Sequence, residues 1–581
     1  MKPATAIASL DTKHSLTAIY FPDILPQYFV VNIFYLLLST AMSDQPHQSF
    51  LRKWGALIIM SLALAIIIID TTLLNVSLGV IIRDLHTNIQ SLQWVITAYA
   101  LALAALTITG GRLGDLFGRK KMFITGAAIF ALGSFVASIS HNVPTLLIGE
   151  SIIEGIGAAL MMPATASLLL SSFRGHDRAI AFGVWGGIAA AASAIGPILG
   201  GYLTTHFSWR WGFRINIVVA AILIIGSVLV HEYRDEKEKP TLDIIGVILS
   251  ALGLLGFIFG IIESSTYGWW TAKQTFMIGS HAVSFGSLSV VPISIVVGLI
   301  FIGLFLWWQK VIAARGRTPL VSLSLFRNRQ FVSGMMTMAV QSLAMTGLIF
   351  VAPVFLQAVR KLDALHTGLA LLLMSIALLI TAPLGAVLSR KIVPKYLIQA
   401  GLLISAVGGY ILWRSITVDA TPMDLAPGFI VFGAGMGFVM AQISNLTLSA
   451  VSVQQAGEAA GVNNTFRQIG SSLGSAIVGA ILLTSLATNV QSQVNASTTI
   501  PNNVKPALLQ SLATQQSNIE FGNGAQLPDS IPANVGTEIQ HIAAVATTQA
   551  NRDALMYTLI FSGLALLVSI GLPGVRNLDR G

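Results

Sequence analysis

The chain has 581 residues, of which 54% are hydrophobic and only 10% are charged, and its mean hydropathy is +0.77. Soluble domains carry about 25% charged residues. This composition therefore excludes a soluble enzyme, a nucleic-acid-binding protein and a disordered scaffold, and it indicates an integral membrane protein. The net charge of +9 is then expected to lie in cytoplasmic loops. The chain has no cysteine, which excludes disulfides and thiolate chemistry.

Residues 1–51 are expected to form a cytoplasmic N-terminal segment. The apolar run from Phe29 to Ala41 has about 13 residues and is too short to span a bilayer. It fits a signal-like segment or an interfacial helix. We favour a third interpretation, in which translation starts at Met42 and residues 1–41 are an upstream extension. The residues from Met42 to Lys53 resemble an ordinary cytoplasmic N-terminus.

About fourteen apolar stretches follow, each close to the roughly 20 residues that a membrane-spanning helix needs. They lie roughly at 54–79, 92–111, 122–140, 143–171, 179–205, 213–231, 243–263, 288–309, 331–358, 366–388, 396–416, 426–449, 461–487 and 554–573. The sequence therefore predicts an all-α integral membrane protein. The polar segment 488–553, rich in Asn, Gln, Ser and Thr, is expected to be a long outer loop with weak helical patches.

Basic residues alternate between rich and poor loops, and this asymmetry predicts the orientation. The rich set includes Arg52-Lys53, Arg119-Lys120-Lys121, Arg174, Arg178, Arg234, Lys237, Lys239, the cluster from Lys310 to Arg329, and Arg390, Lys391, Lys395, Arg576 and Arg580. The positive-inside rule places this set in the cytoplasm. An even number of spans then leaves both termini there. We expect a multi-pass protein of the inner (plasma) membrane.

The order of the loops predicts three regions. The basic loop from Gly111 to Lys121 follows the second span, and a weaker echo from Gly385 to Lys395 follows the tenth. Eight spans separate the two loops. This spacing predicts two six-span halves, 52–231 and 331–581, with two further spans inserted at 232–330. Parallel halves of this kind are typical of transporters.

The segment from Gly111 to Lys121 is the most specific signal in the chain. Its glycines, Gly111 and Gly118 among them, let two helix ends approach closely. Asp115 can accept hydrogen bonds from helix N-termini or basic side chains, and Arg119 can pair with an acid across the interface between the halves. We interpret the segment as a conformational latch. Positive-inside anchoring, the simpler alternative, explains its Lys and Arg but not its Gly-Asp-Gly spacing.

With this loop the chain resembles the major facilitator superfamily, and in particular its fourteen-span drug:proton antiporter branch. Further matching segments are Asp70–Val76 in the first span, Gln93–Tyr99 in the second, Gly196–Gly201 in the fifth, Trp209-Arg210-Trp211 before the sixth, and Asn463–Gly470 in the thirteenth. The resemblance covers roughly residues 52–581. It implies the major facilitator fold and a multidrug efflux function that can confer antibiotic resistance.

The fourth span departs from the family pattern at two positions. The pattern has an arginine, usually linked to proton handling, where this chain has Ser151, and a glutamine where it has Glu154. Three acids, Asp70, Glu154 and Glu150, are expected within spans, the last two one helical turn apart. Carboxylates in lipid are costly and commonly serve proton pathways, and neighbouring ones share protons. Alternatively, each acid is protonated and bonded to a neighbouring helix.

The fifth span carries Gly196, Pro197, Gly200 and Gly201. The proline removes one backbone donor and the glycines remove bulk, so the helix can bend and pack tightly against a neighbour. We interpret this segment as the family's antiporter motif, which limits leak during transport. Generic glycine packing between membrane helices is the alternative.

The thirteenth span carries a polar cluster of Asn463, Asn464 and Arg467. An arginine inside the membrane needs a carboxylate or several carbonyl groups as partners. The alternative is a position at the cytoplasmic mouth, where its side chain snorkels to water. The sequence leaves these two interpretations open.

These observations predict a secondary active transporter, not an enzyme, that exports amphipathic or cationic drugs in exchange for protons by alternating access. No cofactor or metal is expected, because the chain has no nucleotide-binding loop and its ten histidines are scattered. The expected partners are the small-molecule substrate, protons and the lipid bilayer, without nucleic acid; a periplasmic adaptor stays open. One alternative is a uniporter or exporter of a metabolite, lipid or siderophore. Another is a non-transporting membrane sensor or assembly protein.

Overall fold

The structure is a computed structural model that describes residues 50–574, apart from 88, 231–242, 279–280, 390, 453–454, 503–504, 507 and 510–532. The predicted start at Met42 and the apolar run before it lie outside the described residues. Fourteen described helices are long and apolar enough to cross a membrane. The prediction of an all-α membrane protein with about fourteen spans is therefore confirmed.

The N-terminal group of helices comprises α2 to α8. Its members are α2 (Phe50–Asp84), α3 (Ile89–Phe117), α4 (Arg119–Ser138), α5 (Val143–Leu146), the π-helix η1 (Leu147–Glu154), α6 (Gly155–Ser172), α7 (Gly175–His206) and α8 (Arg210–Gly226), which ends in the 3-10 turn η2 (Ser227–Leu229). The segments α5, η1 and α6 form one continuous span.

Two helices lie between the groups in the sequence, α9 (Ile244–Ile262) and α11 (Val290–Ala314), joined by α10 (Ser264–Tyr267) and the antiparallel hairpin β1 (Phe276–Ile278) and β2 (His281–Val283). The C-terminal group follows the short η3 (Leu323–Arg327). It comprises α12 (Arg329–Val354) with η4 (Phe355–Val359), α13 (Ala364–Leu388), α14 (Pro394–Ser415), α15 (Pro422–Leu448), α16 (Ala456–Ala496) and α19 (Ala533–Ser569).

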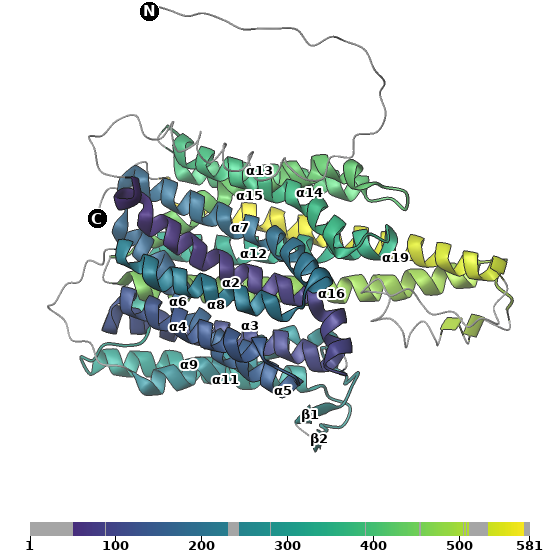
Figure 1. Cartoon of the computed structure of the whole chain (residues 1–581), viewed down its shortest axis with the longest axis horizontal. Helices are drawn as coiled ribbons and strands as arrows, with labels where there is room; N and C mark the ends of the chain where they lie inside the picture. Colours follow the sequence, from purple (N-terminus) through teal and green to yellow (C-terminus); the bar gives the residue numbers. More distant parts are fainter. Residues whose placement is uncertain are drawn as a thin grey trace, which may run out of the picture. The chain divides into compact units, whose positions relative to one another are not determined.

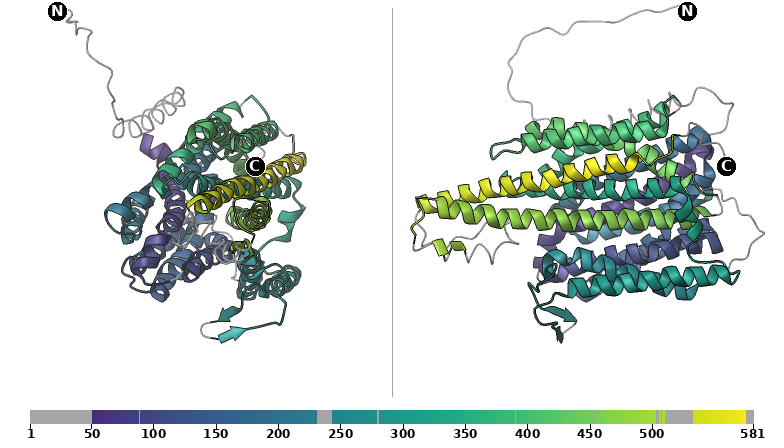
Figure 2. Two further views of the ribbon diagram at one scale, coloured as in Figure 1. Left: turned by 90° about the vertical axis from the view of Figure 1, so that its right-hand side faces the viewer. Right: turned by 180° about the vertical axis from the view of Figure 1, so that it is seen from behind.

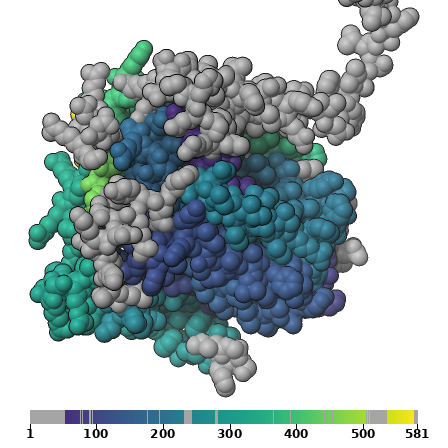
Figure 3. Space-filling model, turned by 60° about the vertical axis from the view of Figure 1, so that its left-hand side comes forward, coloured from purple at the N-terminus to yellow at the C-terminus, as the bar shows by residue number. Residues whose placement is uncertain are grey.

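The long helices run side by side, horizontally in Figure 1. In Figure 3 the blue segments of the N-terminal group form one side of the visible face, and teal-to-green segments form the other. The inserted helices α9 and α11 pack against each other, and α9 also contacts α3 and α16. This arrangement supports our interpretation of the chain as two halves with an insertion between them.

Local sequence signals explain several helix boundaries. Asp243 accepts a 2.9 Å hydrogen bond from the Gly246 backbone N–H and so caps the start of α9. Asn328 caps α12 in the same way, by accepting from the backbone N–H of Gln330 at 3.0 Å. A proline occupies the first helical position of both α14 and α15, where its missing N–H costs nothing.

The prediction of a long outer loop at 488–553 is wrong in part. Helix α16 continues to Ala496, and α19 already begins at Ala533. Both helices extend beyond the rest of the bundle, on the right of Figure 1 and on the left of the right-hand panel of Figure 2. Buried apolar residues hold the two extensions together: Leu486, Val490, Val494, Val535, Ile539 and Ile542. These residues recur at helical spacing. The overall composition of the segment is polar, so it does not reveal this apolar pattern.

One end of the bundle gathers the predicted cytoplasmic loops, and we call it the basic end. It is the end where α3 meets α4 at Arg119-Lys120-Lys121 and where α16 begins. Lys53 and Asp177 join the starts of α2 and α7 there, with 3.0 Å between Nζ and Oδ2. The Nζ of Lys120 donates a 2.9 Å hydrogen bond to the carbonyl oxygen of Val230.

Candidate functional site

Two predicted site acids meet at a single side chain. The Nδ2 of Asn216, on α8, donates a 2.6 Å hydrogen bond to Oδ1 of Asp70 on α2 and also lies 3.1 Å from Oε1 of Glu154, the last residue of η1. Asp70 and Asn216 are each 2% exposed and Glu154 is 0% exposed. We call these three residues the acid pair and its bridge. No basic side chain is bonded to either acid in the described part of the chain.

The second oxygen of each acid is unbonded. Oδ2 of Asp70 and Oε2 of Glu154 are buried and lack a hydrogen-bond partner among the described residues, and so does the hydroxyl of Tyr99. A buried unpaired carboxylate oxygen is costly, because it has lost its water without gaining a donor. A proton bound at such an oxygen would reduce that cost.

Local backbone geometry sets the two acids of the fourth span in different positions. Glu150 and Glu154 both lie in η1, a π-helical stretch, and π-helices within membrane spans are frequently found at functional sites. The Ser151 hydroxyl oxygen lies 2.7 Å from the carbonyl oxygen of Val95 and 2.9 Å from Oε2 of Glu150. Glu150 lines the cavity described next, whereas Glu154 belongs to the acid pair.

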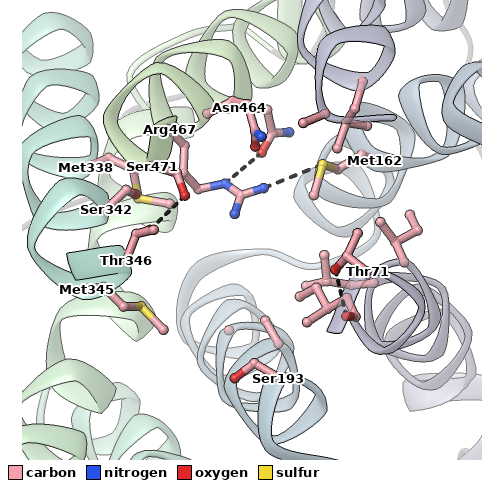
Figure 4. A pocket seen from close by; sticks show the side chains of 18 of the residues that line it. Thr71, Met162, Ser193, Met338, Ser342, Met345, Thr346, Asn464, Arg467 and Ser471 are labelled. Carbon is pink, nitrogen blue, oxygen red and sulfur yellow. Dashed lines mark hydrogen bonds between the residues drawn. The ribbon is translucent and has the colours of Figure 1, made fainter. Parts of the chain in front are cut away.

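A cavity of about 500 Å³ lies between the two groups of helices. Helices α2, α3, η1, α6 and α7 line it from the N-terminal group, and α12, α15 and α16 line it from the C-terminal group. Figure 4 shows side chains from both groups around it: Thr71, Met162 and Ser193 from the first, and Met338, Ser342, Met345, Thr346, Asn464, Arg467 and Ser471 from the second. Asp70 and Glu154 lie behind this wall and not in it.

The predicted polar cluster of the thirteenth span lies in the cavity wall. Asn463, Asn464 and Arg467 all line the cavity from α16. The guanidinium of Arg467 reaches toward α6, where its Nη2 lies 3.5 Å from Sδ of Met162, and its Nε lies 3.4 Å from Oδ1 of Asn464 (Figure 4). Arg467 has no carboxylate partner among the described residues.

The depth of Arg467 bears on the two interpretations that the sequence leaves open. It lies eleven residues beyond Ala456, the first residue of α16, which corresponds to about 17 Å along the helix. The hydrocarbon core of a bilayer is about 30 Å thick. The side chain therefore lies about three turns inside the span and faces the cavity, which favours a cavity group over a snorkelling one.

The predicted antiporter-motif helix packs against the turn that carries Asp70. A Cβ at Gly196 of α7 would overlap Oγ1 of Thr72 and lie 3.1 Å from the carbonyl oxygen of Ile69. A Cβ at Gly200 would lie 3.0 Å from Cγ of Leu73. Gly201, by contrast, has no neighbour within 4 Å of such an atom. Two of the motif's glycines therefore let α7 approach α2 closely.

Pro197, inside α7, lies near α13 of the C-terminal group. A Cβ built on Gly368 of α13 would lie 3.6 Å from Cβ of Pro197 and 2.9 Å from Cγ1 of Ile198. The helix thus contacts both α2 and α13, which places the motif at the interface between the two groups.

The predicted latch joins the groups at the basic end. Asp115 accepts from the backbone N–H of Gly457 at 3.2 Å and from that of Glu458 at 2.9 Å, in the first turn of α16. Its Oδ1 also lies 3.0 Å from Nη2 of Arg119. Unpaired N–H groups and the helix dipole make this position favourable for a carboxylate. The contact across the groups is therefore made by Asp115, and the described acid partner of Arg119 is in the same segment.

The two glycines of the latch have separate structural roles. A Cβ at Gly111 would overlap the carbonyl oxygen of Gly457, so α3 and α16 approach each other there too closely for any larger residue. Gly118 has a φ of 105°, a left-handed conformation that ends α3 and that other residues rarely adopt. Gly111 therefore permits the close contact between α3 and α16, and Gly118 permits the turn into α4.

A second acid extends the latch toward the inserted helices. Glu458 is 1% exposed and accepts from the backbone N–H of Ser322 and, at 3.2 Å, from its hydroxyl. The adjoining backbone N–H of Leu320 donates at 2.7 Å to Oε1 of Gln309 on α11, and Nε2 of Gln309 donates at 2.9 Å to Asp243 at the start of α9. Hydrogen bonds thus connect the insertion to the start of α16.

Sequence reasoning missed Asn216, Ser322 and Glu458 as site residues. Asn216 had a detectable signal, because it is a lone amide in an apolar span whose partner must be another buried polar group. Glu458 lies in the first turn of α16, where an acid is commonly a simple helix-terminal residue. Its bond to Ser322 depends on how the loop before α12 folds back, which no local pattern reveals.

Two acids just beyond the spans lie at the opposite end of the bundle, Asp84 at the end of α2 and Glu263 just after α9. The Trp209 indole N–H and the Arg210 guanidinium donate to Asp84 at 3.0 and 2.6 Å and hold the pKa of that carboxyl below its usual range. Glu263, just after α9, accepts a 3.1 Å hydrogen bond from Thr97 of α3. Burial raises the pKa of Glu263, although the bond from Thr97 partly opposes this effect.

Comparison with known proteins shows which family and which transporters the chain is similar to. The profile of the Major Facilitator Superfamily matches residues 60–475. The tetracenomycin C resistance and export protein of Streptomyces glaucescens is 28% identical over 437 residues, which cover 74% of this chain and 76% of that protein. The multidrug efflux pump LfrA of Mycolicibacterium smegmatis is 26% identical over 542 residues, which cover 93% and 99%.

A solved structure shares the fold. It is a bacterial homologue of the human lysosomal transporter Spinster, in an inward-facing and unoccupied conformation. The match has a TM-score of 0.51 and 16% sequence identity, and it covers 90% of this chain and 98% of that chain. At this level of identity the likeness concerns the arrangement of helices.

Proposed function

Because the chain belongs to the major facilitator superfamily, whose members are transporters and not enzymes, we propose that it is a secondary active exporter of amphipathic small molecules that exchanges them for protons. The names of its relatives, a resistance and export protein and a multidrug efflux pump, support export of drugs or antibiotics. The basic end faces the cytoplasm in this proposal, as the positive-inside rule favours. The expected location is the inner (plasma) membrane.

The acid pair carries the proposal. One amide nitrogen bridges Asp70 and Glu154 in a region that is 0–2% exposed. Two ionised carboxylates at such a site would repel each other without a cation to compensate them. We therefore assign one exchangeable proton to the pair, with the free oxygens of both acids as its binding positions. Glu150 is the neighbouring acid through which the proton reaches the cavity.

The packing around the acid pair supplies a route from proton binding to helix movement. Asp70 lies on the turn of α2 that Gly196 and Gly200 of α7 contact, and α7 in turn contacts α13 of the other group. A change in the charge of Asp70 therefore alters the packing of α2 against α7. Substrate enters the cavity when the latch between α3 and α16 is broken, and it leaves outward when the latch is formed.

Flux in proteoliposomes tests the function. Purified protein is reconstituted, a pH gradient is imposed, and the uphill movement of the amphipathic dyes ethidium and fluorescein is followed. We expect gradient-driven accumulation of at least one dye by the wild type. The variant Glu154→Gln should lose uphill accumulation yet keep downhill exchange, because a neutral amide imitates the protonated acid.

A matched control removes an acid elsewhere. Asp419 lies in the exposed turn between α14 and α15, and Asp419→Asn should leave uphill flux unchanged. Equal flux of every dye with and without the pH gradient in the wild type would overturn proton coupling. Normal uphill flux by Glu154→Gln would remove Glu154 from the proton site and move the assignment to Asp70 or Glu150.

A further inference from the structure

The cavity wall carries one acidic and one basic residue among the described residues that line it. Glu150 and Arg467 are its acidic and basic residues, while Asp70 and Glu154 lie outside the lining. The two contacts of the Ser151 hydroxyl bear on the charge of Glu150, because a hydroxyl has one proton and a carbonyl only accepts. Both contacts are satisfied when Ser151 donates to Val95 and a protonated Glu150 donates to Ser151.

With Glu150 protonated, Arg467 is the charged side chain of the cavity wall that a bound molecule contacts. Among the described residues it contacts an amide oxygen of its own helix and the sulfur of Met162, and neither neutralises a cation. A guanidinium without a counter-charge inside a membrane span is unfavourable, and an anion placed against it removes that cost. Figure 4 shows the group projecting from α16 across the cavity toward α6, so a ligand between the groups lies beside it.

The remaining lining indicates the rest of the ligand. Four methionines, Met162, Met338, Met345 and Met440, contribute flexible sulfur-containing side chains. Such side chains adapt to aromatic rings of varied shape and contact them favourably. The planar guanidinium binds carboxylates through two parallel hydrogen bonds and also stacks on aromatic faces.

We propose that the cavity takes aromatic organic anions, with Arg467 pairing to an ionised carboxylate, phenolate or enolate of the substrate. This inference rests on the proposed function only in placing the substrate in this cavity. It replaces the earlier expectation of a cationic substrate, because Asp70 and Glu154 lie behind the wall and Glu150, which lies in it, is assigned a proton. An inside-negative membrane potential favours the outward movement of an anion, which is consistent with export.

Equilibrium binding to the detergent-solubilised full chain tests the proposal without requiring transport. The probes are fluorescein, an anion, and tetramethylrhodamine methyl ester, a cation with the same ring system, each followed by fluorescence anisotropy. We expect the wild type to bind the anion at least about tenfold more tightly. Arg467→Gln should weaken binding of the anion by about 10- to 100-fold, as for loss of a charged hydrogen-bonded pair. It should leave binding of the cation unchanged or tighter.

Two further variants distinguish an effect of the lost charge on binding from an effect on folding. Arg467→Lys keeps the charge and should retain the preference for the anion at somewhat lower affinity. Arg414→Gln removes an exposed arginine from α14, outside the cavity, and should change nothing. Anion binding by Arg467→Gln equal to that of the wild type would overturn the proposal, as would a wild-type preference for the cation or no saturable binding of the anion. Anion-selective binding without pH-driven flux would uphold this inference and refute proton coupling.

Discussion

The carboxylate of Asp115 accepts a hydrogen bond of 2.9 Å from the backbone N–H of Glu458, which lies 343 residues further along the chain. The bond joins the end of α3 to the first turn of α16 and therefore ties the two groups of helices at the basic end. Because it involves a charged acceptor at a helix N-terminus, its loss should cost about 1.5–3 kcal/mol. In the described conformation this contact holds the end of α3 against the start of α16.

Asp115→Asn should reduce transport at least about tenfold while expression and membrane insertion stay near normal. The amide cannot pair with Arg119 as the carboxylate does, and its NH2 group faces backbone donors in place of an acceptor, so the closed state loses about 10- to 100-fold in population. Dye efflux from cells with matched protein levels measures the effect. Asp177→Asn, which removes a half-buried acid paired with Lys53 at the same end, is the control and should transport normally. Normal efflux by Asp115→Asn would exclude the latch.

Gly196→Ala and Gly201→Ala form a matched pair on α7. A methyl group at position 196 would overlap Thr72, whereas one at position 201 meets no atom within 4 Å. Overpacking costs about 1–3 kcal/mol, so Gly196→Ala should lower the Tm in detergent and reduce transport. Gly201→Ala should be neutral or slightly stabilising, since alanine favours helices over glycine. A larger loss of stability in Gly201→Ala than in Gly196→Ala would contradict the packing described for this helix.

The helices and their number follow from the sequence because a span needs a long apolar stretch, which composition alone reveals. The rotation of each helix about its own axis cannot be predicted from composition. Asp70 and Glu154 are both recognisable as acids within spans, but their meeting at Asn216 depends on how α2, α8 and η1 face one another. The π-helical geometry of η1 also shifts the registry between Glu150 and Glu154, which ordinary helical spacing does not anticipate.

The surroundings of Arg467 are another feature that the sequence does not predict. The sequence identifies it as an arginine within a span, and its depth along α16 follows from counting residues. Its neighbours do not, because Met162 belongs to the other group of helices and is 305 residues away in the chain. The extensions of α16 and α19 were missed for a different reason, since their apolar contacts are sparse and are surrounded by Asn, Gln, Ser and Thr.

Glu263→Gln should stabilise the protein at neutral pH. Burial raises the folded-state pKa of Glu263 above its unfolded value of about 4.3, so the folded state binds the proton more tightly than the unfolded state does. Stability from this residue is therefore present in acid, and it decreases as pH rises from about 4.3 through the folded pKa. The variant removes this penalty and keeps an oxygen that accepts from Thr97.

The measurement is the Tm of wild type and Glu263→Gln in detergent between about pH 5 and about pH 8. The variant should have the higher Tm at the alkaline end, and the difference should shrink toward acid. A difference in Tm that grows as the pH falls would show that the sign assigned to Glu263 is wrong. Thr97→Val, which removes the donor to Glu263, should enlarge the penalty at neutral pH.

The shared proton of Asp70 and Glu154 is the central claim, and infrared difference spectroscopy of the carboxyl C=O stretch tests it without any substrate. Spectra of the purified protein are compared between about pH 5 and about pH 9, a window in which ordinary exposed carboxyls barely titrate. The account predicts a titrating carboxyl band that is lost in Glu154→Gln and lost or shifted in Asp70→Asn, while Asp419→Asn leaves it intact. Superimposable spectra of the wild type and Glu154→Gln across the whole window would contradict it.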